Sequence, residues 1–202
     1  MKNINTYIVE KLKIIKPKSV KHTLFPKDKY ELINMIVKEI KQNGYECSLN
    51  HIDVSKITNL DNVFWYNETK NFNGDISQWD VSNTESMQGL FELSYFEGDI
   101  SDWDVSNVEN MALMFYGSSF DGDLSTWDVS NVETMSDMFA NSIYSGKNGN
   151  ISKWNVSNVL NMEHMFYNSN FNQDISKWQI NPKCEIYRMF DDCPIKKKYR
   201  PF

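Results

Sequence analysis

The sequence predicts an α/β solenoid, in which short repeats stack with a parallel strand ladder on one side and short helices on the other. A helical cap is expected at its amino-terminal end. Three observations predict this fold class: a nearly constant 24-residue period, a change of apolar spacing within each period, and an apolar helical segment directly before the first repeat.

Tryptophan marks the period. From Trp79 to Trp178, five tryptophans follow one another at intervals of 24, 24, 27 and 24 residues, and each of these five stands in a version of Asp-Ile-Ser-x-Trp-Asp-Val-Ser-Asn-Val. A degenerate first unit with Ile52 in the tryptophan place brings the number of units to six. Because the spacing equals the structural period, we expect a buried ladder rather than an exposed platform for sugar rings. The ladder consists of Trp79, Trp103, Trp127, Trp154 and Trp178.

Within a unit, the apolar spacing changes from two to three and four. Trp103 and Val105 alternate with polar residues, as in a short strand with one buried face. The following segment, with Ser106 and Glu109 spaced as in a capping box, is expected to begin a helix. Its apolar residues recur at helical intervals; they are Val108, Met111, Met114 and Phe115.

The ends differ from the repeats. Apolar residues at helical spacing predict one helix over Asn5–Ile15 and a stronger one over Asp28–Gln42, between Pro26 and Gly44. The last segment cannot continue a helix through Pro194, so we expect it to fold over the final unit. The expected division is a basic arm at 1–24, a helical cap at 25–47, a six-unit solenoid at 48–193 and a basic tail at 194–202.

Charge is segregated along the chain. Residues 1–47 hold ten lysines against five acids, residues 48–183 hold six lysines against nineteen acids, and residues 184–202 hold five bases against three acids. The acidic centre would repel phosphate, which argues against nucleic acid as a partner. No apolar run is long enough for a membrane span, and charges at Glu10, Lys11 and Lys13 interrupt any signal peptide. We expect the cytoplasm of a bacterium or phage-infected cell, or a virion.

Catalytic and metal-binding patterns are not found in the sequence. The three histidines have no suitably spaced nucleophile or acid, so we expect no enzyme, no cofactor and no small-molecule substrate. An aspartate row could share calcium ions, but each carboxylate could equally bond its own turn, which we favour. The row is Asp75, Asp99, Asp123 and Asp174. We expect three reduced cysteines, with a Cys184–Cys193 disulfide as the alternative.

The repeats resemble a known family. Phe-Asn-x-Asp-Ile-Ser-x-Trp-Asp-Val-Ser-Asn-Val, followed by Met-x-x-Met-Phe, begins in variant forms at Phe72, Phe96, Phe120 and Phe171. This pattern is similar to that of BspA-like leucine-rich-repeat surface proteins, the type also found in Mycoplasma lipoproteins. The segments Tyr7–Ile14 and Cys193–Phe202 are similar to ends of repeat proteins of gut bacteriophages. The resemblance implies a leucine-rich-repeat-like solenoid that adheres to or binds proteins.

Binding is expected where the repeats vary. The residues just before and just after each tryptophan should point outward if the tryptophan points inward. We therefore predict a non-catalytic module that binds another protein; the alternative is a structural or virion-associated component held through its amino-terminal arm. The predicted partner-binding residues are Gln78, Asp80, Asp102, Asp104, Thr126, Asp128, Lys153, Asn155, Lys177 and Gln179.

Overall fold

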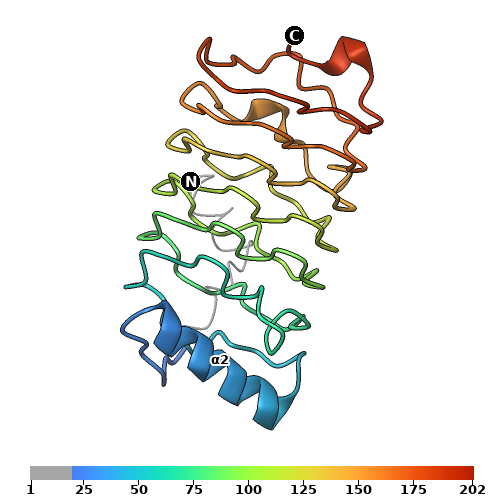
Figure 1. Cartoon of the computed structure of the whole chain (residues 1–202). Coiled ribbons are helices and arrows are strands. Elements are labelled where there is room, and N and C mark those ends of the chain that lie inside the picture. Colours follow the sequence, from blue (N-terminus) through green and yellow to red (C-terminus); the bar gives the residue numbers. More distant parts are fainter. Residues whose placement is uncertain (1–19) are drawn as a thin grey trace, which may run out of the picture.

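A computed structural model describes residues 20–202 of the chain. The repeats lie one above another as irregular coils, from helix α2 at one end to the carboxyl terminus at the other (Figure 1). We number them coils 1 to 6 by the residue in the tryptophan place. These residues are Ile52, Trp79, Trp103, Trp127, Trp154 and Trp178. The regular elements are α2 (Lys29–Asn43) and two short 3₁₀ helices, η1 (Ile151–Lys153) and η2 (Lys197–Tyr199).

The predicted strand ladder is wrong. Among residues 20–202, parallel pairing between coils occurs only as isolated bridges, and Trp103 and Val105 take part in none of them. The repeated bridge lies seven residues after the tryptophan, as between Asn110 and Thr134. The alternation around Trp103 arises from a tight turn instead, because the Trp103 N–H donates to Ile100 O at 3.2 Å. A turn can bury every second residue without any strand partner.

The predicted short helices are wrong as well. From Met87 to Leu93, alternate N–H groups donate to the next coil: Met87 N to Asn110 O and Gly89 N to Ala112 O, both at 2.9 Å. Intervening N–H groups close β-turns, as Leu90 N does by donating to Met87 O at 3.1 Å. Gly89 and Leu93 have φ of 59° and 54°, and this left-handed conformation breaks a right-handed helix. Such turns still bury residues at intervals of three and four.

The core consists of stacked side-chain ladders. All five ladder tryptophans are only 4% exposed, which confirms their predicted burial. Each indole N–H donates to a carbonyl of the preceding coil, as Trp127 Nε1 does to Ile100 O at 3.1 Å. The phenylalanines also stack; the rings of Phe91 and Phe115 have centroids 5.7 Å apart and nearly parallel planes. Aromatic side chains therefore join each coil to the next.

Helix α2 covers coil 1. It begins after Asp28, whose carboxylate accepts from the N–H groups of Tyr30 and Glu31 at 2.9 Å, and it ends at Gly44. Its buried face consists of Leu32, Ile36 and Ile40. Asp28–Gln42, where the sequence predicts a helix, thus differs from α2 by one residue at each end. The helix predicted over Asn5–Ile15 lies outside the described residues.

The carboxyl-terminal tail folds over coil 6, as predicted. Ile195 is 3% exposed, and Tyr199 O accepts from Ile175 N at 3.0 Å. The cysteines Cys47, Cys184 and Cys193 are free thiols, so the alternative disulfide is not formed. No helix within residues 20–202 has the length and apolar content needed to cross a membrane.

We predict opposite effects for two neighbouring substitutions in coil 4. Trp127→Ala should lower the free energy of unfolding by about 3–5 kcal/mol, because it leaves a cavity and removes the indole hydrogen bond to Ile100 O. Thr126→Lys should cost about 1 kcal/mol or less, since it removes one exposed hydrogen bond, from Thr126 Oγ1 to Ser101 O. Urea denaturation followed by circular dichroism measures both. Equal losses would contradict the assignment of inside and outside.

Candidate binding face

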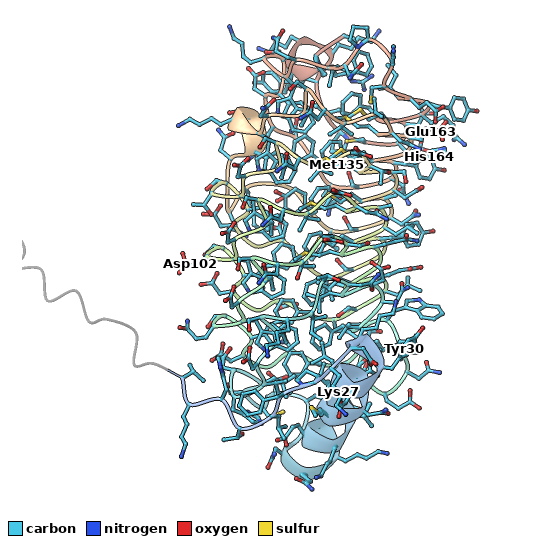
Figure 2. The ribbon with its side chains drawn as sticks, turned by 90° about the vertical axis from the view of Figure 1, so that its left-hand side faces the viewer. Lys27, Tyr30, Asp102, Met135, Glu163 and His164 are labelled. Atoms are coloured by element: carbon cyan, nitrogen blue, oxygen red, sulfur yellow. The ribbon has the colours of Figure 1, made fainter. Side chains whose placement is uncertain are left out.

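All ten residues predicted to bind a partner are exposed. They flank the buried tryptophans at the turn of each coil rather than along a strand. Figure 2 places Asp102 at one edge of the stack, with Glu163 and His164 at the opposite edge and Met135 between the two edges. The ten residues, one on either side of the tryptophan in each of coils 2 to 6, are called the predicted row below, although no strand carries them.

Several of these side chains also hold their own turns. Asp104 Oδ1 accepts from Ser106 N at 3.1 Å and from Ser106 Oγ at 2.6 Å, and Asp80 and Asn155 make the same pair of bonds. The side-chain and backbone hydrogen bonds from Ser130 lower the pKa of Asp128, because they stabilise its charged form. These residues contribute charge to the face, but one oxygen of each is already bonded.

Three charged residues of the predicted set, Asp102, Lys153 and Lys177, do not hold their turns through their side chains. Their side chains make no hydrogen bond or ion pair within the described part of the chain, so their charged groups remain available to a partner. Gln179 Nε2 bonds to Lys177 O at 3.2 Å, and Gln78 Nε2 bonds to Ser77 Oγ at 3.4 Å.

The aspartate row holds turns, as favoured by the sequence. Asp75 Oδ1 accepts from Ser77 N at 3.0 Å and from Ser77 Oγ at 2.8 Å. Asp99 and Asp174 bond Ser101 and Ser176 in the same way, and Asp123 accepts from Ser125 N. Within residues 20–202, no group of three or more histidine, cysteine, aspartate or glutamate side chains is arranged to hold a metal ion.

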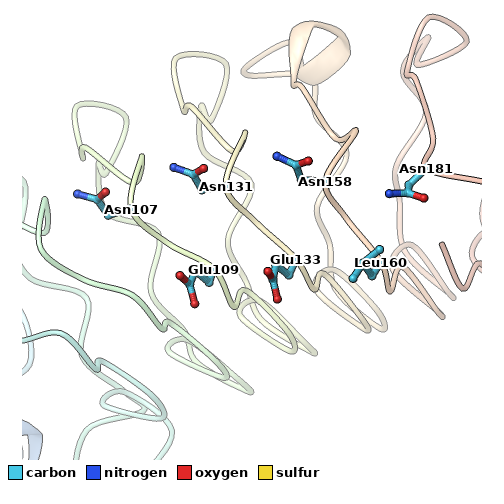
Figure 3. Close-up of a pocket in the computed structure, with 7 residues that line it drawn as sticks. All are labelled: Asn107, Glu109, Asn131, Glu133, Asn158, Leu160 and Asn181. Atoms are coloured by element: carbon cyan, nitrogen blue, oxygen red, sulfur yellow. The ribbon is translucent and has the colours of Figure 1, made fainter. Parts of the chain in front are cut away.

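A second row of residues was missed at the sequence level. An asparagine in each of coils 2 to 6 donates from Nδ2 to a serine carbonyl of the preceding coil, as Asn131 does to Ser106 O and Asn107 to Ser82 O, both at 2.7 Å. Two residues further along, exposed glutamates Glu109 and Glu133 line the same surface (Figure 3). Together they form an open groove of about 590 Å³. Its lining residues are Asn107, Glu109, Asn131, Glu133, Asn158, Leu160 and Asn181.

This groove corrects the capping-box prediction. Ser106 does not cap a helix; its hydroxyl donates to Asp104, and the side chain of Glu109 makes no hydrogen bond or ion pair within the described residues. Regular repetition of Ser-Asn-x-Glu was the signal that could have revealed the groove, because a fixed phase aligns identical side chains on successive coils.

Charge divides this surface into two halves. We call the predicted row and the groove together the binding face. Coils 2 to 4 present only acids among its charged residues, and coils 5 and 6 present Lys153 and Lys177 instead. The change occurs where Glu133 of coil 4 is replaced by Leu160 of coil 5. The acidic residues of the first half, including Glu85 in the same column as Glu109, are Asp80, Glu85, Asp102, Asp104, Asp128, Glu109 and Glu133.

Comparison with known families identifies the repeats. Residues 32–145 and 123–199 match the family described as Mycoplasma protein of unknown function, DUF285. The matched residues cover most of the chain. The chain belongs to the DUF285 family. Searches of curated proteins and of solved structures gave no match. This match assigns the repeats to a Mycoplasma-type family, and the description of that family gives no function.

We predict that the asparagines and the glutamates of the groove differ in what they contribute to stability. Asn131→Ala should lower the free energy of unfolding by about 0.5–1.5 kcal/mol, because it removes the bond to the Ser106 carbonyl. Glu133→Gln should change it by less than about 0.5 kcal/mol, since this exposed side chain holds no neighbour. Chemical denaturation tests the pair, and a larger cost for Glu133→Gln would mean that the groove is structural.

Calcium should not stabilise the fold. Because Oδ1 of both Asp75 and Asp99 holds a turn, and the described residues contain no group of side chains arranged to hold a metal ion, excess chelator should leave the melting temperature unchanged. A ligand that binds only the folded state raises stability by about 2.7 kcal/mol at a concentration of about 100 Kd. A clear rise in melting temperature on adding calcium would therefore show that the aspartate row binds metal.

Proposed function

We propose that the chain is a non-catalytic binding module that holds another protein through its binding face. The observation that carries the proposal is the charge division of this face over a constant core. Ladder residues repeat almost unchanged from coil to coil, whereas the exposed residues change from acidic on coils 2 to 4 to basic on coils 5 and 6. Selection for folding alone does not require such a division.

The partner is a protein that presents a basic surface to coils 2 to 4. Glu109 and Glu133 are exposed carboxylates that form no ion pair among residues 20–202. They stand at equivalent positions of neighbouring coils, so that like charges follow one another along the stack. Lysine or arginine side chains of a partner would relieve this repulsion and would give a salt-dependent association rate. The resemblance to BspA-like surface proteins agrees with such a role and forms part of the proposal.

The alternative, a structural or virion-associated component, depends on the arm at residues 1–24. Most of that arm lies outside the described residues, so this alternative stays a prediction. Thr23 N and Leu24 O hydrogen-bond to coil 1 at 2.9 Å, to His51 O and from Asp53 N respectively. A deletion that tests the arm should therefore end before this pairing.

The proposed function predicts that three glutamates control partner capture. The variant Glu85→Gln, Glu109→Gln, Glu133→Gln removes three charges from the face and keeps side-chain shape. In affinity capture from native cells with quantitative mass spectrometry, a specific partner should fall about tenfold or more, equivalent to about 1.4 kcal/mol.

A matched control separates this effect from net charge. Glu46→Gln, Glu97→Gln, Asp192→Asn removes the same number of charges from exposed positions outside the face. It should capture the partner as the unaltered chain does. Equal loss in both variants would indicate unspecific attraction, and no loss in either would show that the binding face is not the contact surface.

A further inference from the structure

One tryptophan stands apart from the ladder. Trp65 is 43% exposed, whereas the five ladder tryptophans are 4% exposed. Ladder indoles donate to a backbone carbonyl, but the Trp65 indole N–H makes no hydrogen bond within residues 20–202. A large apolar ring with a free donor at the surface is unusual in a framework that buries all its other indoles.

Trp65 lies in a loop that only coil 1 contains. Phe64 and Phe72 are eight residues apart, whereas the corresponding Phe91 and Phe96 are five apart. The longer loop is held in place by Thr69, which is buried and donates from Oγ1 to Val63 O at 2.9 Å. Thr69 N also donates to Tyr66 O at 2.9 Å. The loop therefore presents Trp65 in a preorganised position.

Leu93 of coil 2 lies beside this loop. Its backbone has a left-handed conformation, which glycine and asparagine adopt more readily than leucine. Its φ is 54°, in the left-handed region, and its side chain is 50% exposed. The corresponding positions of coils 3 to 6 hold residues that tolerate this conformation, namely Gly117, Asn141, Asn168 and Asp192. The Leu93 side chain lies beside Gly117 of coil 3 but stays half exposed, and strained backbone positions of this kind are often found at binding sites.

The hollow between these residues combines apolar walls with a polar rim. It has a volume of about 280 Å³ and is lined by Trp65, Tyr66, Asn67, Glu68, Lys70 and Leu93. The side chains of Asn67, Glu68 and Lys70 make no hydrogen bond or ion pair within the described chain. The rim thus offers both donors and acceptors, and the indole adds another donor.

These features match the chemistry of a sugar ring. A pyranose has one face of C–H groups, which packs on an aromatic ring, and hydroxyl groups around its edge, which need donors and acceptors. The volume is slightly below the roughly 300–1,000 Å³ found for pockets that hold drug-sized ligands, as expected for a site that takes a single sugar ring. A stable protein interface requires about 800 Å² from each partner, which this hollow cannot supply. We propose that the hollow between Trp65 and Leu93 binds one pyranose unit of a glycan.

The glycan proposal predicts binding of simple glycosides that depends on Trp65. N-acetylglucosamine, methyl α-mannopyranoside and methyl β-galactopyranoside serve as probes in saturation-transfer-difference NMR. A single shallow site implies a Kd of about 1 mM or weaker, so probes are used at several millimolar and above. At least one should give a saturable signal, and it should shield Trp65 from acrylamide quenching, because the other five indoles are already buried.

Three variants distinguish the hollow from the rest of the surface. Trp65→Ala and Leu93→Asn should each weaken the signal about tenfold or more. Leu93→Asn reproduces the residue found at Asn141 and Asn168, so it should fold at least as well as the unaltered chain, and its melting curve checks this. Tyr45→Ala removes an exposed ring that does not line the hollow and should leave binding unchanged.

Two results would overturn the glycan proposal. One is a set of probes that gives no saturable signal, or an equal signal with Trp65→Ala and Leu93→Asn. The other is loss of protein capture by Trp65→Ala without any sugar binding, which would make the hollow part of a protein contact. Neither result bears on the glutamate variants, because Glu85, Glu109 and Glu133 lie outside the hollow.

Discussion

Backbone hydrogen bonds between neighbouring coils are the interaction on which this structure depends. Outside α2 and two 3₁₀ turns, the described chain forms neither helices nor sheets, yet much of its backbone lies beside a closely packed core. Buried N–H and C=O groups must have partners. Met87, Gly89 and Phe91 donate to coil 3, and their counterparts repeat these bonds up the stack. Each coil thus satisfies the polar groups of its neighbour.

Side chains complete what the backbone leaves unpaired. The tryptophan indoles and the asparagine amides both reach back to carbonyls of the preceding coil, one inside the core and the other at the surface. Because these contacts join only nearest neighbours, the stability of the stack is expected to depend on local interfaces, and its ends require covers. Helix α2 covers the first coil, and Ile195 with the tail that follows covers the last.

The division between constant and variable residues locates the binding surfaces. Where a residue serves the stack, as Trp127 or Asn131 does, it recurs in nearly every coil. Departures occur at exposed positions, and they concern two separate surfaces: the charged binding face, and the hollow around Trp65 and Leu93. A stack of this kind can change its surface chemistry without disturbing its core, because neighbouring coils contact each other mainly through the repeated positions.

The amino-acid sequence by itself determined the six units, the burial of the tryptophan ladder, the helix before coil 1 and the exposure of the residues around each tryptophan. Burial of Trp103 follows from its period, and the helix at Lys29–Asn43 follows from local apolar spacing and end signals. The first depends on a pattern repeated along the chain and the second on one short segment, and neither requires knowledge of which atoms meet in space. The role of Asn107 did not follow, because its partner is a carbonyl of another coil, at Ser82.

Only the tertiary structure decided between regular elements and turns. Alternation at Trp103–Val105 and spacing of three and four at Val108–Phe115 suit a strand and a helix, but β-turns and left-handed residues bury the same positions. The choice depends on where N–H groups find acceptors. Leu113 has φ of 59° and donates to Ser136 O in the next coil at 2.9 Å. Hydrogen bonds to the neighbouring coil thus replace those within a helix, and no single repeat contains that information.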